Sequence, residues 1–254
     1  MSAPKNPSLA AAALILAALP ALALDQTVRL HGSTAVVDQV TDPYWAAVAQ
    51  QTGTAMEVIG NSTGRGLVDL VSGRCEVALL SEPLGIAVQA AALAGRTVDP
   101  STLQFRVVKH DQIVFVVHPS NPVTSLTWEQ LRDIHTGRVK NWKEVGGRDM
   151  VITVVTDTVT GGTRALVKEA VLGGADYGST SVALSTIRKV ADMVGANPNG
   201  IGAIDKRLVN PSRNKVLETR ALERPLGFAT VGPPSEPVRR VLDALEAAVK
   251  KDAR

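Results

Sequence analysis

Four short turns rich in glycine and hydroxyl residues constrain this fold more than any other feature, because each follows a predicted strand and opens a predicted helix. They are Gly32-Ser33-Thr34, residues 60–66 (GNSTGRG), Ser81-Glu82-Pro83 and residues 160–164 (TGGTR), after strands predicted at 27–31, 55–59, 75–80 and 151–155. The third strand is continuous and apolar, as buried parallel strands are. Strands and helices that alternate in this way predict an α/β sheet with its ligand crevice at the carboxyl ends of the strands.

The rest of the chain continues the alternation. A helical stretch is predicted after the Gly32-Ser33-Thr34 turn, through Tyr44 and Val48 to Gln51. Further helices are predicted at 67–71, 83–93, 163–172 and 184–194, and further strands at 105–108, 112–117, 201–204 and 227–231. Thr127 and Gln130 form a capping box at the start of one more helix, which Gly137 ends. A terminal helix opens at Ser235 and carries an apolar face.

Composition excludes several classes of function. The chain has one cysteine, Cys75, which excludes an internal disulfide framework and a thiolate-cluster metal site. A net charge of +3 is too small to require nucleic acid, and an aromatic fraction of 3% disfavours the ring stacking used by sugar and single-stranded nucleic acid sites. The four histidines do not fall at metal-ligand spacing. We therefore expect no metal, no cofactor and no nucleic acid partner.

The N-terminus is typical of an exported protein. Lys5 is followed by an apolar run at 9–19, and Ala21-Leu22-Ala23 supplies the small residues that a signal peptidase needs. The run is too short to span a bilayer as a helix, and no cysteine follows it to carry a lipid. We predict that residues 1–23 are a cleaved signal peptide and that the mature protein is periplasmic.

The chemistry of the four turns favours an anion. The N-terminus of a helix carries unpaired N–H groups and partial positive charge, so it holds an anion with few basic side chains. Hydroxyls add short donors, and glycines let the backbone approach a ligand closely. One such turn is an ordinary helix cap, whereas four of them predict convergence on one small anion.

These turns resemble those of the phosphate-type periplasmic solute-binding proteins of ABC importers, which have the bilobal type II binding-protein fold. The resemblance runs over nearly the whole mature chain and includes residues 141–147 (NWKEVGG), 197–202 (NPNGIG) and 232–235 (GPPS). It implies two α/β lobes with a hinge and an interlobe cleft. We expect lobe 1 to consist of residues 24–115 plus 226–254 and lobe 2 of residues 116–225, with crossings within 111–117 and near 226–230.

The resemblance also implies a site and a partner. Donors from both lobes would close on phosphate or a related oxyanion, which a monomeric protein then delivers to an inner-membrane ABC permease without covalent chemistry or catalytic residues. The implied ligand-binding residues are Ser33, Thr34, Asn61, Ser62, Thr63, Arg65, Ser81 and Glu82 from lobe 1, and Gly161, Gly162, Thr163 and Arg164 from lobe 2.

Two positions depart from the family pattern. The family commonly has serine where Gly161 stands, and its phosphate binders often have arginine where Asp157 stands. A carboxylate that points inward would repel a dianion, by on the order of 4 kcal/mol for two unit charges in a partly dry cleft. Arg65 or Arg164 would restore the positive charge. Arg164 opposes the helix dipole in its first turn, so it needs a partner, either the ligand or Asp157.

Two interpretations of Glu82 stay open. As an acceptor, Glu82 would take a proton that hydrogen phosphate carries and sulfate lacks, which would select phosphate. As an acid at the start of a helix, beside Pro83, it is also favoured by the helix dipole alone.

Other functions remain as alternatives. A diverged receptor of the same fold would use Asp157 to read a cationic or hydroxylated solute, and a sensor would present its closed form to a signalling partner. The GNSTG turn at 60–64 also matches the G-x-S-x-G elbow of a secreted serine hydrolase, with Ser62 as nucleophile. No histidine follows His135, although that fold usually keeps its base late in the chain, so we favour a binding protein over an enzyme.

Overall fold

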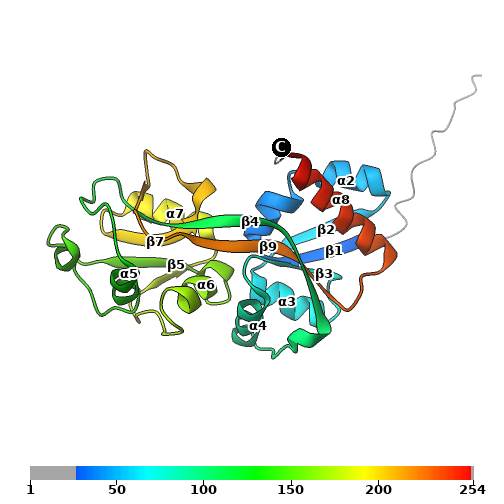
Figure 1. Ribbon diagram of the computed structural model, residues 1–254, viewed down its shortest axis with the longest axis horizontal. Helices are drawn as coiled ribbons and strands as arrows, with labels where there is room; N and C mark the ends of the chain where they lie inside the picture. The colour runs from blue at the N-terminus through cyan, green and yellow to red at the C-terminus, as the bar shows by residue number, and fades with distance from the viewer. Residues whose placement is uncertain (1–26, 253–254) are drawn as a thin grey trace, which may run out of the picture.

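The computed structural model describes residues 27–252, which form two lobes around one mixed sheet. Figure 1 shows the lobes side by side, joined by two long strands, β4 (Leu103–Val117) and β9 (Leu222–Val231). The predicted two-lobed α/β fold is confirmed. The predicted signal peptide at residues 1–23 lies outside the described residues.

The sheet runs through both lobes in the order β2-β1-β3-β9-β4-β7-β5-β6. Its shorter strands are β1 (Thr27–Gly32), β2 (Ala55–Gly60), β3 (Val77–Leu80), β5 (Thr153–Asp157), β6 (Val182–Leu184), β7 (Gly200–Asp205) and β8 (Lys215–Val216). In lobe 1, β1 pairs in parallel with β2 and β3, and in lobe 2, β5 pairs in parallel with β6 and β7. The long strands run antiparallel to each other between these two groups, and β8 pairs with the end of β4. Each lobe therefore presents the carboxyl ends of its parallel strands to the other lobe.

Helices cover both faces of each part of the sheet (Figure 1). Lobe 1 carries α1 (Thr34–Val36), α2 (Trp45–Thr52), α3 (Thr63–Val71), α4 (Leu84–Leu93) and α8 (Glu236–Asp252), and lobe 2 carries α5 (Trp128–His135), α6 (Gly162–Ala170) and α7 (Ile187–Ala196). Shorter helical turns are η1 (Val37–Thr41), η2 (Pro100–Thr102), η3 (Trp142–Val145) and η4 (Lys206–Leu208). Across residues 27–252, no helix has the length and apolar character needed to cross a membrane.

Alternation along the strands divides the buried side chains into separate cores. In β3, Val77 and Leu79 pack in the core that α8 covers, while Ala78 and Leu80 pack in the core that α3 and α4 cover. The cores of lobe 1 draw on residues 28–108 and 226–249, and those of lobe 2 on residues 113–222. The lobe boundaries at residues 115 and 226 stay predictions.

Several predicted elements differ from the structure, among them the strand predicted at 227–231, which begins earlier, at Leu222, as β9. The strands predicted at 105–108 and 112–117 are one strand, β4, whose register with β9 shifts between Val107 and Lys109. The helix predicted at 184–194 begins only at Ile187, because the residues before it form β6 at the sheet edge. The first helical stretch of lobe 1 is interrupted by η1, a π-helical turn. The capping box of Thr127 and Gln130 is confirmed at the start of α5.

Candidate functional site

A cavity of about 400 Å³ lies between the lobes, at the carboxyl ends of the parallel strands. Of the residues implied by the resemblance, those that line it are Ser33, Thr34, Asn61, Ser62, Thr63, Arg65, Ser81, Gly161, Gly162 and Thr163. Glu82 and Arg164 are not among the lining residues. Residues that line it without having been predicted as ligand-binding include Asp157, Thr158, Ser185, Thr186 and Arg224. Hydroxyls and backbone from both lobes thus surround one space.

The N-terminus of α3 is fixed at the cavity by its packing on β1. The backbone N–H groups of Asn61 and Ser62 both donate to the carbonyl oxygen of Gly32, at 2.9 and 3.0 Å. Gly66 lies so close to the end of β1 that a Cβ on it would stand 2.8 Å from the carbonyl carbon of His31. A glycine at this position therefore lets the first turn of α3 reach the sheet edge.

Ser62 holds a strained backbone conformation at the start of α3. Its φ of 90° and ψ of 152° belong to a region that is almost exclusive to glycine. Its hydroxyl lies 2.9 Å from the hydroxyl of Thr160 in lobe 2, and the N–H of Gly64 donates to the Thr160 carbonyl at 3.3 Å. The strained turn thus contacts the opposite lobe, which indicates a closed arrangement.

Because Ser62 is strained, we expect its glycine and alanine variants to differ in stability although both lose affinity for the ligand. Ser62→Gly and Ser62→Ala both remove the hydroxyl, but only glycine relieves the backbone. We expect Ser62→Gly to be about 1–3 kcal/mol more stable than Ser62→Ala in chemical denaturation without ligand. Both variants should bind ligand more weakly than the wild type in calorimetry. Equal stability of the two variants would contradict the strain.

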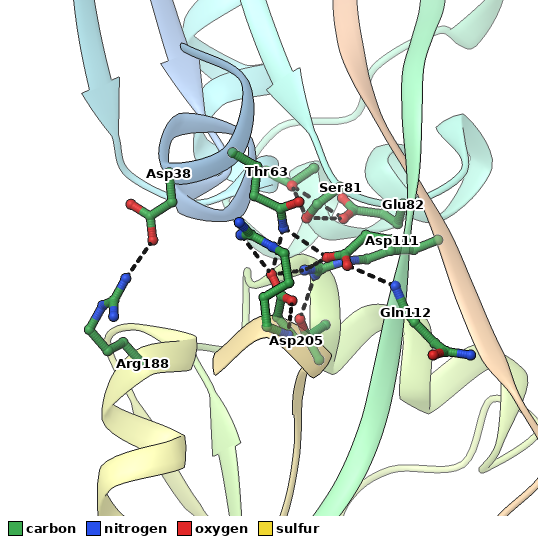
Figure 2. A network of polar contacts seen from close by, with 12 residues as sticks. Asp38, Thr63, Ser81, Glu82, Asp111, Gln112, Arg188 and Asp205 are labelled. Atoms are coloured by element: carbon green, nitrogen blue, oxygen red, sulfur yellow. Dashed lines mark hydrogen bonds and ion pairs between the residues drawn. The ribbon is translucent and has the colours of Figure 1, made fainter. Parts of the chain in front are cut away.

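Glu82 is fully buried behind the cavity wall. Its Oε2 accepts hydrogen bonds from the hydroxyls of Thr63 and Ser81, at 3.2 and 3.0 Å (Figure 2). Its Oε1 is buried without a hydrogen-bond partner among the described residues. Burial raises the pKa of Glu82 to about 7, although Thr63, Ser81 and the charge of Arg224 oppose the rise. Among the described residues, Glu82 therefore keeps one acceptor oxygen without a partner, behind the wall of the site.

Asp157 is a second buried carboxyl group, and it lines the cavity itself. Burial raises its pKa to about 6, opposed by the charge of Arg224 and by a hydrogen bond from the backbone N–H of Arg164. Its Oδ2 overlaps the position that a Cβ on Gly161 would take, and its Cγ would stand 2.6 Å from that Cβ. A serine at 161 would therefore force this carboxylate to move. The two departures from the family pattern are therefore coupled.

Arg224 supplies a positive charge that sequence reasoning missed. Its guanidinium, on β9, is 1% exposed, donating to the Thr163 hydroxyl at 2.8 Å and to Asp111 Oδ2 at 3.0 Å. The register of the sheet places Arg224 directly opposite Asp111 on β4. In the sequence, Arg224 alternates with Leu222 and Leu226, which is typical of an inward-facing position of a strand. The predicted strand begins only at residue 227, so it does not include this position.

Two further polar groups hold Arg224 in place. Asp205 Oδ2 lies 3.7 Å from the guanidinium, and Gln39, on η1, donates to Asp205 at 2.5 Å and to Asp111 at 2.9 Å. Burial and the neighbouring charge of Asp111 raise the pKa of Asp205. Burial also acts to raise the pKa of Asp111, but the charge of Arg224 and the amide of Gln39 prevail and lower it. The cluster joins both lobes to the long strands.

The two arginines predicted to restore the site's charge behave differently. Arg65 lines the cavity. The guanidinium of Arg164 instead lies over the ring of Tyr177, 4.1 Å from its centre. The partner of the Arg164 guanidinium is thus Tyr177 of lobe 2, and neither the ligand nor Asp157 as predicted. The buried cation at the cavity is Arg224.

A surface ion pair closes the cleft on another side. Asp38 of η1 and Arg188 of α7 meet at 3.1 Å, and Figure 2 shows this pair bridging the two lobes. Both side chains are partly exposed, so the pair contributes at most about 1 kcal/mol.

The geometry around Ser62 does not resemble a hydrolase triad. Within residues 27–252, the hydrogen-bond partner of the Ser62 hydroxyl is Thr160, whereas a nucleophilic serine needs a base in contact. His31, on the neighbouring strand, directs its Nδ1 to Asp69 at 2.9 Å. The arrangement suits a donor of hydrogen bonds rather than a nucleophile.

Comparisons with known proteins agree with this architecture. A family model described as a PBP superfamily domain matches residues 21–247. A phosphate-binding protein of Bacillus subtilis (strain 168) is 40% identical over 83 residues, which are 32% of this chain and 28% of that relative, so less than a third of the relative's length is matched. An ABC-type phosphate transport receptor from Vibrio cholerae is 25% identical, with a TM-score of 0.71 over 89% of this chain and 96% of that one. A Clostridium perfringens structure with bound phosphate shares the fold, at 24% identity and a TM-score of 0.73 over 86% and 92% of the two chains.

Proposed function

Because this chain belongs to the PBP superfamily, we propose that it is a solute-binding protein that captures phosphate between its lobes for an ABC importer. The observation that carries the proposal is the convergence of α3 and α6 on one cavity. The residues at both helix starts, with their hydroxyls and glycines, line the same space from opposite lobes. Two helix N-termini that face one cavity favour a small anion there.

Closure of the lobes follows from the same arrangement. Thr63 comes from lobe 1 and Thr163 from lobe 2, so only a closed molecule brings both sets of donors to one ligand. A ligand that binds the closed state better shifts the molecule toward that state. The 400 Å³ cavity is partly open to solvent, which leaves a route for entry.

Titration with inorganic phosphate tests the proposal. We expect phosphate to raise the melting temperature of the purified protein, because a ligand that binds only the folded state stabilises it. At about a hundred times the dissociation constant the gain should reach about 2.7 kcal/mol. Calorimetry should give one site per chain. The absence of any shift with phosphate, arsenate or sulfate would favour the diverged receptor.

Glu82→Gln tests selection by proton acceptance. A neutral amide at this position no longer needs a proton from the ligand, so phosphate should bind at least about tenfold more weakly, with a loss of roughly 1.5–3 kcal/mol for a charge-assisted hydrogen bond. The preference for phosphate over sulfate should shrink. Glu129→Gln, which changes an exposed carboxylate of lobe 2, is the control. Unchanged phosphate affinity in Glu82→Gln would remove Glu82 from the site.

The remaining parts of the proposal concern location and partners. The predicted signal peptide would direct export, and the importer role needs a protein outside the inner membrane, so we propose that the protein works in the periplasm. We also propose that it works as a monomer. Its partner would be a membrane permease that accepts the closed form and releases the ligand. Fractionation of cells and co-purification with a permease test these points.

A further inference from the structure

Two carboxyl groups, Asp157 and Glu82, lie at the start of α6, where they would repel a dianion. Gly161 and Gly162 are consecutive, and a carboxylate lies against each: Asp157 against the first and Glu82 against the second. Gly161, Gly162 and Asp157 all line the cavity. A ligand seated at the start of α6 therefore lies near two carboxyl groups: Asp157 of lobe 2, which lines the cavity, and Glu82 of lobe 1, which lies behind its wall.

The guanidinium of Arg224, a buried cation at the cavity, is already shared among other groups. Arg224 donates to Asp111 and to Thr163, and Asp205 lies 3.7 Å from it. The other charged or titratable groups that face Asp157 are Arg164, whose guanidinium stacks on Tyr177, and Tyr177 itself. Arg65 is exposed at the rim. Within residues 27–252, no arginine forms an ion pair with Asp157, so its carboxylate charge is not neutralised by direct contact.

The two carboxylates determine how many protons a bound phosphate must carry, because each of them needs a hydrogen-bond donor. An ionised carboxylate only accepts hydrogen bonds, and so does an unprotonated phosphate oxygen. Hydrogen phosphate carries one proton and satisfies one carboxylate, which leaves the other facing an acceptor. A second proton in the closed site removes that repulsion.

We propose that Asp157 is a specificity-determining residue, and that with Glu82 it restricts the bound species to dihydrogen phosphate, the singly charged form. This proposal rests on the proposed function. Above neutral pH, hydrogen phosphate must take one proton from solution as it binds, and that proton lies between the ligand and one of the two carboxylates. Sulfate, which has no proton to donate, is then rejected by two groups instead of one.

Calorimetry with inorganic phosphate in buffers of different ionisation enthalpy counts that proton. From about pH 8 to about pH 9 free phosphate is a dianion, and both carboxylates are ionised before binding, since their pKa values are about 7 and about 6. The wild-type protein should take up about one proton per phosphate bound. Its dissociation constant should accordingly rise about tenfold per pH unit.

Asp157→Asn removes the second charge with little change of shape. In this variant proton uptake and the slope should both fall to about zero in the same range. Asp192→Asn, which removes an exposed carboxylate of the same lobe outside the cavity, should behave as the wild type. A melting curve of each variant confirms folding.

The outcomes separate the two proposals. Phosphate binding without proton uptake in the wild type would overturn the role of Asp157 and leave phosphate capture standing. No phosphate binding at any pH would overturn the proposed function itself. Proton uptake that persists in folded Asp157→Asn would assign the proton to Glu82 alone and also overturn the proposal.

Discussion

Arg224→Met should destabilise the protein by about 3–5 kcal/mol, because it leaves buried carboxylates without their cation. Asp111 and Asp205 both face this guanidinium, and their side chains are 6% and 2% exposed. Chemical denaturation of the unliganded protein measures the loss. Phosphate affinity should fall as well, since the variant no longer orients Thr163.

The pH dependence of this loss gives an independent check. Without the guanidinium, both carboxyl groups acquire raised pKa values in the folded state. Their destabilising effect is present at neutral pH and disappears as the pH falls through those raised values, so the deficit should shrink toward about pH 5. A triple variant that adds Asp111→Asn and Asp205→Asn should recover much of the stability. A deficit independent of both pH and these substitutions would indicate lost packing instead.

Gly162→Ala should block closure without harming the fold. A Cβ at this position would overlap Glu82 Oε2 and stand 2.5 Å from Ser81 Oγ, both in the opposite lobe. Overpacking of this kind costs about 1–3 kcal/mol, which corresponds to roughly a 5- to 150-fold loss of phosphate affinity. Gly162 is the first residue of α6, where alanine is compatible with the helix, so the stability of the unliganded protein should hold.

Gly85→Ala is the matched control. Gly85 also lies in the first turn of a helix, α4, and a Cβ there would meet nothing within 4 Å. It should leave phosphate affinity unchanged. X-ray scattering with and without phosphate should show compaction in the wild type and in Gly85→Ala but not in Gly162→Ala. Normal compaction in Gly162→Ala would contradict the close approach of the lobes.

The parts of the site that could be predicted share a local signal. The turn at 60–66 follows one parallel strand and Ser81 follows another, so their position at the same sheet edge comes from the fold class alone. The sequence of each turn identifies it without knowledge of its neighbours. The two-lobed fold could be predicted for the same reason, from alternation and family resemblance.

What could not be predicted depends on long-range register. Arg224 and Asp111 matter because the antiparallel pairing of β9 and β4 sets them opposite each other, and no local pattern encodes that pairing. The polar stretch Lys109-His110-Asp111 lies between the two strands predicted at 105–108 and 112–117. In the structure β4 passes through it, because the chain there leaves one core and enters the next.

The long pairing of β4 with β9 also bears on how the molecule can move. The two strands pair from Leu103 opposite Val231 to Ile113 opposite Leu222, with one register shift between Val107 and Lys109. A twisted two-stranded ribbon of this kind has no flexible loop that could serve as the hinge. We therefore expect the lobes to open by a change in the twist of β4 against β9, which makes the stiffness of this ribbon a determinant of how easily the cleft opens.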